Sequence, residues 1–138
     1  MKKIILCFII AILCFGFFGC SKTTTDENLW ENALYTEDVE LGEGENTVFV
    51  EVVAQDKTVT FTVHSDKTML GDALSLHNLI DGEKGAYGLY VKKVNGIVAD
   101  YDVNRTYWSF LKNGESMMCG VDMAEFKDGD HYEFVYTK

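Results

Sequence analysis

Two runs of alternating hydrophobic and polar positions predict a β-hairpin within residues 47–64. In the runs 47–54 and 58–64, bulky apolar residues stand at every second position: Val48, Val50, Val52, Val59, Phe61 and Val63. Side chains at every second position of a strand share one face of a sheet. Residues 55–57, Gln-Asp-Lys, can form the turn. We therefore expect two antiparallel strands with one buried face and one polar face.

The spacing of apolar residues becomes helical after this hairpin. Within residues 69–80 it involves Leu70, Ala73, Leu74 and His77, flanked by Leu76 and Ile80. This spacing predicts an amphipathic helix. Residues 65–68 offer helix N-caps, and Asp81-Gly82 is a typical helix end. We interpret the glycine-rich residues 82–88 as a loop.

The second half of the chain predicts short strands joined by tight turns. We expect strands at residues 89–94, 97–98, 107–112 and 132–137. Asn95-Gly96 and Asn113-Gly114 are strong hairpin signals, and Asp128-Gly129-Asp130 predicts a further turn. A hairpin, one helix and then more strands predict the α+β class. A β-grasp-like fold, with one helix packed on a mixed sheet, fits this order.

The N-terminus predicts a signal peptide at residues 1–19. Lys2 and Lys3 precede an apolar run at residues 4–18, which is shorter than the roughly 20 residues that span a bilayer. The run ends in Phe17-Phe18-Gly19-Cys20, which resembles the lipobox of bacterial lipoproteins, where the cysteine is lipidated. We expect Cys20 to anchor the protein at the extracellular or periplasmic face of the cell membrane. The alternative is an ordinary signal peptide with an incidental cysteine.

Residues 20–45 predict an acidic, flexible tether between the anchor and the domain. This segment is polar and has no sustained apolar period. A coil of this length spans roughly 25–30 Å. Two apolar pairs, Leu29-Trp30 and Leu34-Tyr35, are exceptions that could dock on the domain. We assign the folded domain to residues 46–138.

Charge and cysteine content narrow the possible partners. The chain has 12 basic and 22 acidic residues, a net charge of -10. Nucleic acid is disfavoured as a partner, because binding to phosphates needs clustered Lys and Arg. After Cys20, Cys119 is the one remaining cysteine of the sequence, so no internal disulfide is expected. We interpret Cys119 as a small buried hydrophobic residue rather than a reactive thiol.

Four segments, taken in order, resemble the transcobalamin-like C-terminal domain family. They are residues 68–74 (TMLGDAL), 88–96 (GLYVKKVNG), 107–114 (YWSFLKNG) and 128–130 (DGD) before an aromatic strand. The resemblance covers about residues 48–138. It implies a β-grasp-like domain of a secreted or lipid-anchored protein and a role in holding a flat, bulky ligand such as a corrinoid. The family's vitamin carriers add a large helical domain, and this chain matches the small domain alone, so modest affinity is implied.

Aromatic residues near the second Asn-Gly turn are the candidate ligand-binding residues. Adjacent residues of a strand face opposite ways, so one of Tyr107 and Trp108 can be buried while the other is exposed. An exposed ring beside Asn113 could stack on a planar ligand. Tyr87 and Tyr90 could extend this surface. The alternative is that these rings, Trp108 above all, are core aromatics.

The sequence gives little support to metal binding or catalysis. Met117-Met118-Cys119 consists of soft ligands that suit Cu(I), but we interpret these residues as core filling. Asp128 and Asp130 lack the spacing of a calcium loop. No nucleophile motif or phosphate-binding loop is present in the sequence. We expect no enzyme, no resident metal and no cofactor other than a corrinoid ligand. The expected function is non-catalytic capture of a small ligand for uptake, and the alternative is a surface module that binds another protein or mediates adhesion.

Overall fold

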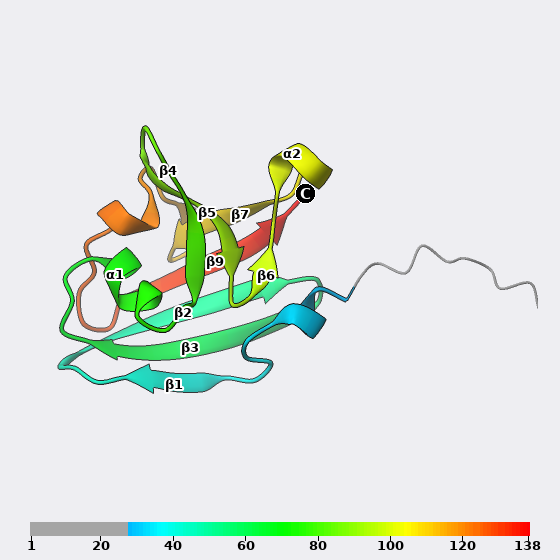
Figure 1. The fold of residues 1–138 in the computed structure, drawn as a ribbon. Coiled ribbons are helices and arrows are strands. Elements are labelled where there is room, and N and C mark those ends of the chain that lie inside the picture. Colours follow the sequence, from blue (N-terminus) through cyan, green and yellow to red (C-terminus); the bar gives the residue numbers. More distant parts are fainter. Residues whose placement is uncertain (1–27) are drawn as a thin grey trace, which may run out of the picture.

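The computed structural model describes residues 28–138, which are built around a six-stranded mixed sheet (Figure 1). The strand order is β1-β3-β2-β9-β7-β8. The strands are β1 Val39–Gly42, β2 Asn46–Ala54, β3 Lys57–Ser65, β7 Tyr107–Lys112, β8 Glu115–Ser116 and β9 His131–Thr137. The pairs β1–β3 and β2–β9 are parallel, and the other pairs of this sheet are antiparallel.

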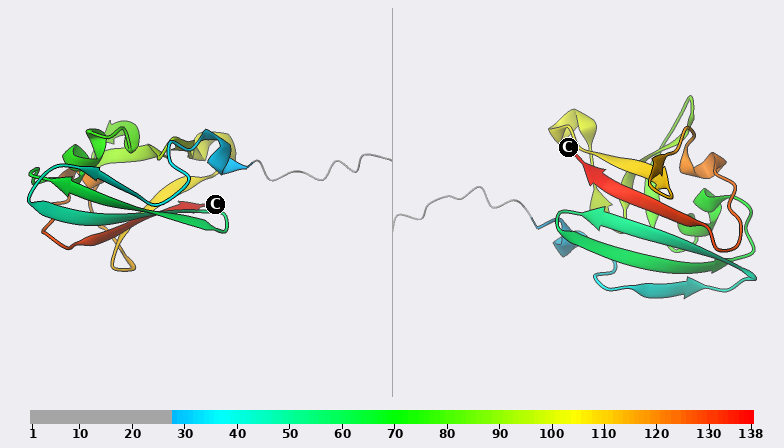
Figure 2. Two further views of the ribbon diagram at one scale, coloured as in Figure 1. Left: turned by 90° about the horizontal axis from the view of Figure 1, so that it is seen from below. Right: turned by 180° about the vertical axis from the view of Figure 1, so that it is seen from behind.

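A second layer covers one face of this sheet (Figure 2). It contains a small antiparallel sheet in the order β4-β5-β6 and several short helices. The strands are β4 Ile80–Gly85, β5 Gly88–Val94 and β6 Ile97–Val98. The α-helices are α1 Leu70–Ser75 and α2 Tyr101–Asn104, and the 3-10 helices are η3 Leu29–Asn32 and η4 Val121–Met123.

The hydrophobic core lies between the two layers. The alternating sequence pattern correctly predicted which residues of the first hairpin face this core. All six apolar positions predicted for the first hairpin are buried: Val48, Val50, Val52, Val59, Phe61 and Val63. The last strand adds Tyr132 and Phe134, whose rings lie near that of Phe110 on β7. From the second layer, α1 contributes Leu70, Ala73 and Leu74. A mixed sheet whose one face is covered by a layer with short helices confirms the predicted α+β, β-grasp-like class.

The helix predicted at residues 69–80 is much shorter than expected. It ends at Ser75, and Asn78 adopts a left-handed conformation with φ 56° that turns the chain away. Residues 80–85 then pair with β5 as β4, so part of the predicted glycine-rich loop is a strand. No Ser or Thr side chain caps α1; its N-cap is Met69, and the Leu70 amide donates to the Ala124 carbonyl at 2.8 Å. Strand pairing and this distant carbonyl therefore override the local helical signals.

Residues 28–45 are part of the fold rather than a flexible tether. The indole of Trp30 is buried, and its Nε1 donates to the Ala54 carbonyl at 3.0 Å. The ring of Tyr35 packs edge-on against Phe61 at 5.6 Å between centroids. β1 then extends the sheet beside β3. The predicted boundary at residue 46 is wrong for this reason, although docking of the two apolar pairs had been anticipated.

Other predictions concern the start of the chain and its turns. The signal peptide, Cys20 and the beginning of the tether lie outside the described residues. Both Asn-Gly turns are confirmed, with φ 51° and 81° for Asn95 and Gly96 and φ 50° and 81° for Asn113 and Gly114. Within residues 28–138, no helix is long and apolar enough to cross a bilayer.

Candidate ligand-binding groove

A groove runs between the tip of the β4–β5 hairpin and the segment that leads from β8 to η4. We call it the hairpin groove. Its main hollow has a volume of about 470 Å³. It is lined by Gly85, Ala86, Tyr87, Gly88, Leu89, Tyr90, Met117, Met118, Cys119 and Gly120. Figure 1 shows the hairpin in green beside this orange segment, and Figure 2 shows the same arrangement from behind.

Backbone contacts hold the two walls of the hairpin groove together. The amide of Gly120 donates to the Tyr87 carbonyl at 3.1 Å. The amide of Leu89 donates to the Asp122 carboxylate at 2.7 Å. Gly120 permits this approach, because a Cβ at that position would stand 2.8 Å from the Leu89 nitrogen. The walls are therefore fixed by hydrogen bonds before any ligand arrives, which lowers the entropy cost of binding.

A second hollow continues the groove toward β7. Its volume is about 340 Å³, and it shares Leu89, Tyr90, Met117, Cys119 and Gly120 with the first. Tyr107, Trp108, Ser109 and Phe110 line its far end. Ligand sites are commonly apolar hollows of about 300–1,000 Å³ with a few polar groups. The two connected hollows meet that description with apolar walls and tyrosine hydroxyl groups.

Three of the five predicted ligand-binding residues present exposed rings along this groove. Tyr87 stands at the hairpin tip with 84% of its surface exposed. Tyr90 on β5 and Tyr107 on β7 are also exposed and line the second hollow. The ring of Tyr107 packs edge-on against that of Tyr101, at 6.5 Å between centroids. Strand and hairpin geometry thus gather aromatic residues that are far apart in sequence.

Trp108 and Asn113 have different positions from those three tyrosines. Trp108 is 7% exposed, and its Nε1 donates to the Ile97 carbonyl at 3.1 Å. It forms part of the floor of the second hollow rather than an open stacking surface. Asn113 follows the end of β7 remote from Tyr107 and lines neither hollow. The structure therefore does not unite Tyr107 and Asn113 at one turn.

The sulfur residues of the groove depart from their predicted place in the core. Met118 is 94% exposed. Met117 and Cys119 are half-buried, packed against the core on one side and lining both hollows on the other. Sequence reasoning noted this tripeptide but missed its role as a wall of the groove. The contact that puts it there, between Gly120 and Tyr87, is non-local and carries no sequence signal of its own.

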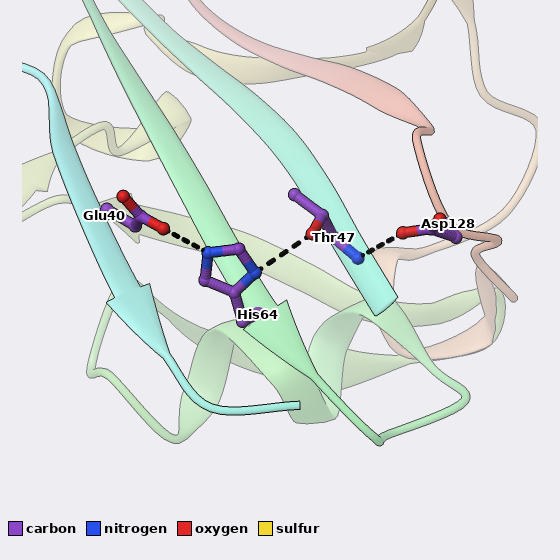
Figure 3. Close-up of polar contacts among 4 residues, drawn as sticks. All are labelled: Glu40, Thr47, His64 and Asp128. Atoms are coloured by element: carbon purple, nitrogen blue, oxygen red, sulfur yellow. Dashed lines mark hydrogen bonds and ion pairs between the residues drawn. The ribbon is translucent and has the colours of Figure 1, made fainter. Parts of the chain in front are cut away.

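A separate polar chain crosses the open face of the large sheet (Figure 3). Nε2 of His64 on β3 lies 2.5 Å from the Glu40 carboxylate on β1, and Nδ1 lies 3.0 Å from the Thr47 hydroxyl on β2. The Thr47 amide donates to the Asp128 carboxylate at 2.7 Å. A carboxylate, an imidazole and a hydroxyl in this order occur in hydrolases. Here the Thr47 amide, which could stabilise an oxyanion, already donates to the Asp128 carboxylate. We therefore interpret this chain of contacts as a link between β1, β3, β2 and the turn at Asp128.

The turn at Asp128-Gly129-Asp130 is stabilised by charge. The Asp130 carboxylate accepts from the Lys127 amide at 2.9 Å and lies 3.1 Å from the Lys112 ammonium. Burial opposes the charged carboxylate, but these two donors prevail and lower the pKa of Asp130. The hydrogen bond with Asp130 raises the pKa of Lys112. With Gly129 at φ 88°, this geometry supports the prediction of a turn rather than a calcium loop.

The chain belongs to the family described as "Domain of unknown function (DUF4430)", whose family model matches residues 66–138. This is a transcobalamin-like domain family, as the four segments of the sequence suggested. A crystal structure at 1.30 Å resolution from Ruminococcus gnavus ATCC 29149, of a protein provisionally described as metal-binding, is 33% identical to this chain. It superposes with a TM-score of 0.64, covering 68% of this chain and 98% of that one.

Haptocorrin, solved in complex with Cbi, shows the same fold at greater distance. It is 20% identical, with a TM-score of 0.53, over 71% of this chain and 26% of haptocorrin. This chain therefore corresponds to about a quarter of haptocorrin, and the likeness concerns the fold alone. No curated protein matches the sequence.

Proposed function

We propose that this protein is a cell-surface lipoprotein whose hairpin groove binds a small, flat organic ligand without catalysis, a corrinoid being the first candidate. The observation that carries the proposal is the pair of connected hollows edged by the exposed rings of Tyr87, Tyr90 and Tyr107. Exposed aromatic side chains cost little entropy to order and offer flat faces for stacking. The binding of Cbi by haptocorrin makes a corrinoid the natural first probe.

The groove is too open to bury a large ligand completely. Its hollows are shallow recesses between one hairpin and one loop, whereas tight small-molecule sites bury most of the ligand surface. We therefore expect modest affinity for the isolated chain. A second protein that closes over the exposed part of the ligand would raise it, and delivery to an uptake system would fit such weak capture.

A fluorescence titration with cobinamide tests this proposal. The full chain should show saturable quenching, with a dissociation constant below about 100 μM. Tyr90→Ala should weaken binding about three- to tenfold, because an aromatic contact contributes about 1 kcal/mol. Phe49→Ala is the matched control, since Phe49 on β2 is also exposed, at 37% against 46% for Tyr90, and lines neither hollow. Absence of any response at that concentration, or equal losses in the two variants, would overturn the proposal.

Lipidation of Cys20 is a separate part of the proposal. Its support is the resemblance of residues 17–20 to a lipobox after a short apolar run behind Lys2 and Lys3. Seven residues, 21–27, lie in sequence between Cys20 and Asn28, the N-cap of η3, and seven residues span at most about 25 Å. Cys20→Ser should abolish labelling by a radioactive fatty acid, and Cys119→Ser should not. Labelling that survives Cys20→Ser would contradict an anchor at this position.

The sheet edge gives less support to the alternative of a protein-interaction module. β1 at the edge has only the four residues Val39–Gly42 and is flanked by Asp38 and Glu43. Short edge strands with nearby charges are how proteins discourage added strands. An interaction role would therefore have to use the groove itself, and a captured protein partner with no response to cobinamide would favour it.

A further inference from the structure

We propose that the wall of the hairpin groove formed by Met117, Met118 and Cys119 is a binding site for a soft monovalent metal ion, Cu(I). All three residues line the same hollow of about 470 Å³. Thioether and thiolate sulfurs are the ligands that Cu(I) prefers, and low coordination numbers suit it. The inference rests on these sulfurs alone and does not require the groove to bind a corrinoid.

The burial of the three residues favours ligation over a structural role. A methionine that fills a core gap is enclosed, whereas Met118 is 94% exposed at the mouth of the hollow. Met117 and Cys119 are half-buried, so each has one side packed on the core and one side toward the hollow. The two more buried sulfur residues would thus hold the ion from the floor, and Met118 would close over it.

The backbone around the tripeptide fixes it at both ends. The Met117 amide donates to the Phe110 carbonyl on β7 at 2.9 Å, and the Gly120 amide donates to the Tyr87 carbonyl at 3.1 Å. Anchoring the segment on both sides of Cys119 reduces the freedom lost when its sulfurs converge on an ion. Gly88 opposite carries no side chain, and the Met123 side chain lies beside it, adding a fourth sulfur residue near the hairpin.

Harder metals are disfavoured by the same surroundings. Among residues 28–138 there is no group of three or more His, Cys, Asp or Glu side chains placed to hold a metal. Zinc and calcium need such nitrogen, thiolate and oxygen sets. A site with one thiol and two thioethers instead matches Cu(I): binding transfers the thiol proton of Cys119 to solvent and forms a copper–thiolate bond, with no change of oxidation state.

Anaerobic competition with the chelator bicinchoninate tests this site. The full chain would carry Cys7→Ser, Cys14→Ser and Cys20→Ser to remove its other thiols. Cu(I) should bind at one equivalent, with loss of a thiol proton. Because even groups that only support metal ligands change affinity by about 10–100-fold, Cys119→Ser should weaken binding more than about 100-fold.

Two further variants separate ligation from folding. Met117→Leu combined with Met118→Leu keeps the volume and should weaken Cu(I) binding about tenfold or more. Met69→Leu, at the start of α1 and outside the groove, should leave it unchanged. Circular dichroism should be the same for all variants. Absence of one-equivalent binding, or equal affinity in the Cys119→Ser and parent chains, would overturn the inference. Cobinamide quenching of the parent chain without copper tests the proposed function separately.

Discussion

The side chain of Asn95 joins the N-terminal segment, residues 28–45, to the second layer. Its amide group donates to the Tyr35 carbonyl at 2.8 Å, and its carbonyl oxygen accepts from the Tyr35 amide at 3.0 Å. The residue is fully buried and has φ 51° in the β5–β6 turn. The Asn-Gly pair therefore forms a turn. Its Asn95 side chain also pairs with the backbone of Tyr35, sixty positions earlier in the chain, as a neighbouring strand would.

Asn95→Ala should destabilise the fold by about 2 kcal/mol, since two buried hydrogen bonds worth about 1 kcal/mol each are lost. Asn113→Ala is the matched control, because Asn113 has the same turn conformation with φ 50° but is exposed. We expect its effect to be less than half as large. Urea unfolding of the two variants measures the difference, and equal destabilisation would contradict the pairing role of Asn95.

Asp130 should give the fold an acid-sensitive contribution to stability. Its pKa is lower in the folded state than the value of about 3.9 for an unfolded chain, so folding releases a proton in this range. The contribution is therefore present above about pH 4 and is lost as the pH falls through the folded-state pKa. Asp130→Asn should make the unfolding free energy less dependent on pH below about pH 4 than in the parent chain. Identical pH profiles would contradict this assignment.

At the scale of elements, the N-terminal segment changes the boundary of the domain. Trp30 on η3 is 7% exposed and packs against the end of the first hairpin, with the Lys57 ammonium 4.9 Å from its ring centroid. β1 then adds a strand that the polar, glycine-containing sequence around Glu40 did not predict. The N-terminal segment is held by elements that come later in the chain: β1 pairs with β3, and Tyr35 bonds with Asn95 in the β5–β6 turn.

Trp30→Ala should therefore lower the free energy of unfolding by about 3–5 kcal/mol, as expected for a buried aromatic residue. Leu34→Ala nearby, with its side chain half exposed, should cost less than about 1 kcal/mol. Thermal unfolding followed by circular dichroism measures both. If Trp30→Ala were as mild as Leu34→Ala, residues 28–45 would behave as the tether that the sequence predicted.

The predictable elements were those with strong local periodicity. Buried positions alternate with less buried ones along β2 and β3, and residues 58–64 alternate strictly in sequence. Both Asn-Gly turns require the left-handed conformation that Asn and Gly adopt readily. The helix was overestimated, because Leu76 is exposed, Asn78 turns the chain, and Ile80 pairs with Val94 on β5. Pairing between distant strands decided that region, and periodicity alone does not encode it.

The candidate site was predictable in its residue types and not in its shape. Exposed tyrosines and the Met117–Cys119 tripeptide were both singled out from the sequence, but as separate features. Their union depends on the approach of Gly120 to Tyr87 and Leu89, a contact between segments more than thirty residues apart. Trp108, a candidate binding residue in the sequence, is buried, and its Nε1 donates a hydrogen bond to the Ile97 carbonyl.

At the scale of the whole molecule, the tip of the β4–β5 hairpin and η3 lie far apart. Figure 1 shows η3 in blue at the end of the first hairpin, remote from the tip of the β4–β5 hairpin, and Figure 2 agrees. If Cys20 carries a lipid, the negative charge of the chain, with 22 acidic and 12 basic residues, would keep the domain off anionic lipid headgroups.

The central claim, that the hairpin groove is the ligand-binding site, is tested most directly by mapping backbone amide chemical shifts while cobinamide is added. The account predicts saturable shifts confined to residues 85–91, 107–110 and 116–121, with little change at Thr60 or Thr62 on the open face of the large sheet. Shifts centred on that open face, or no shifts at a cobinamide concentration of about 100 μM, would contradict it.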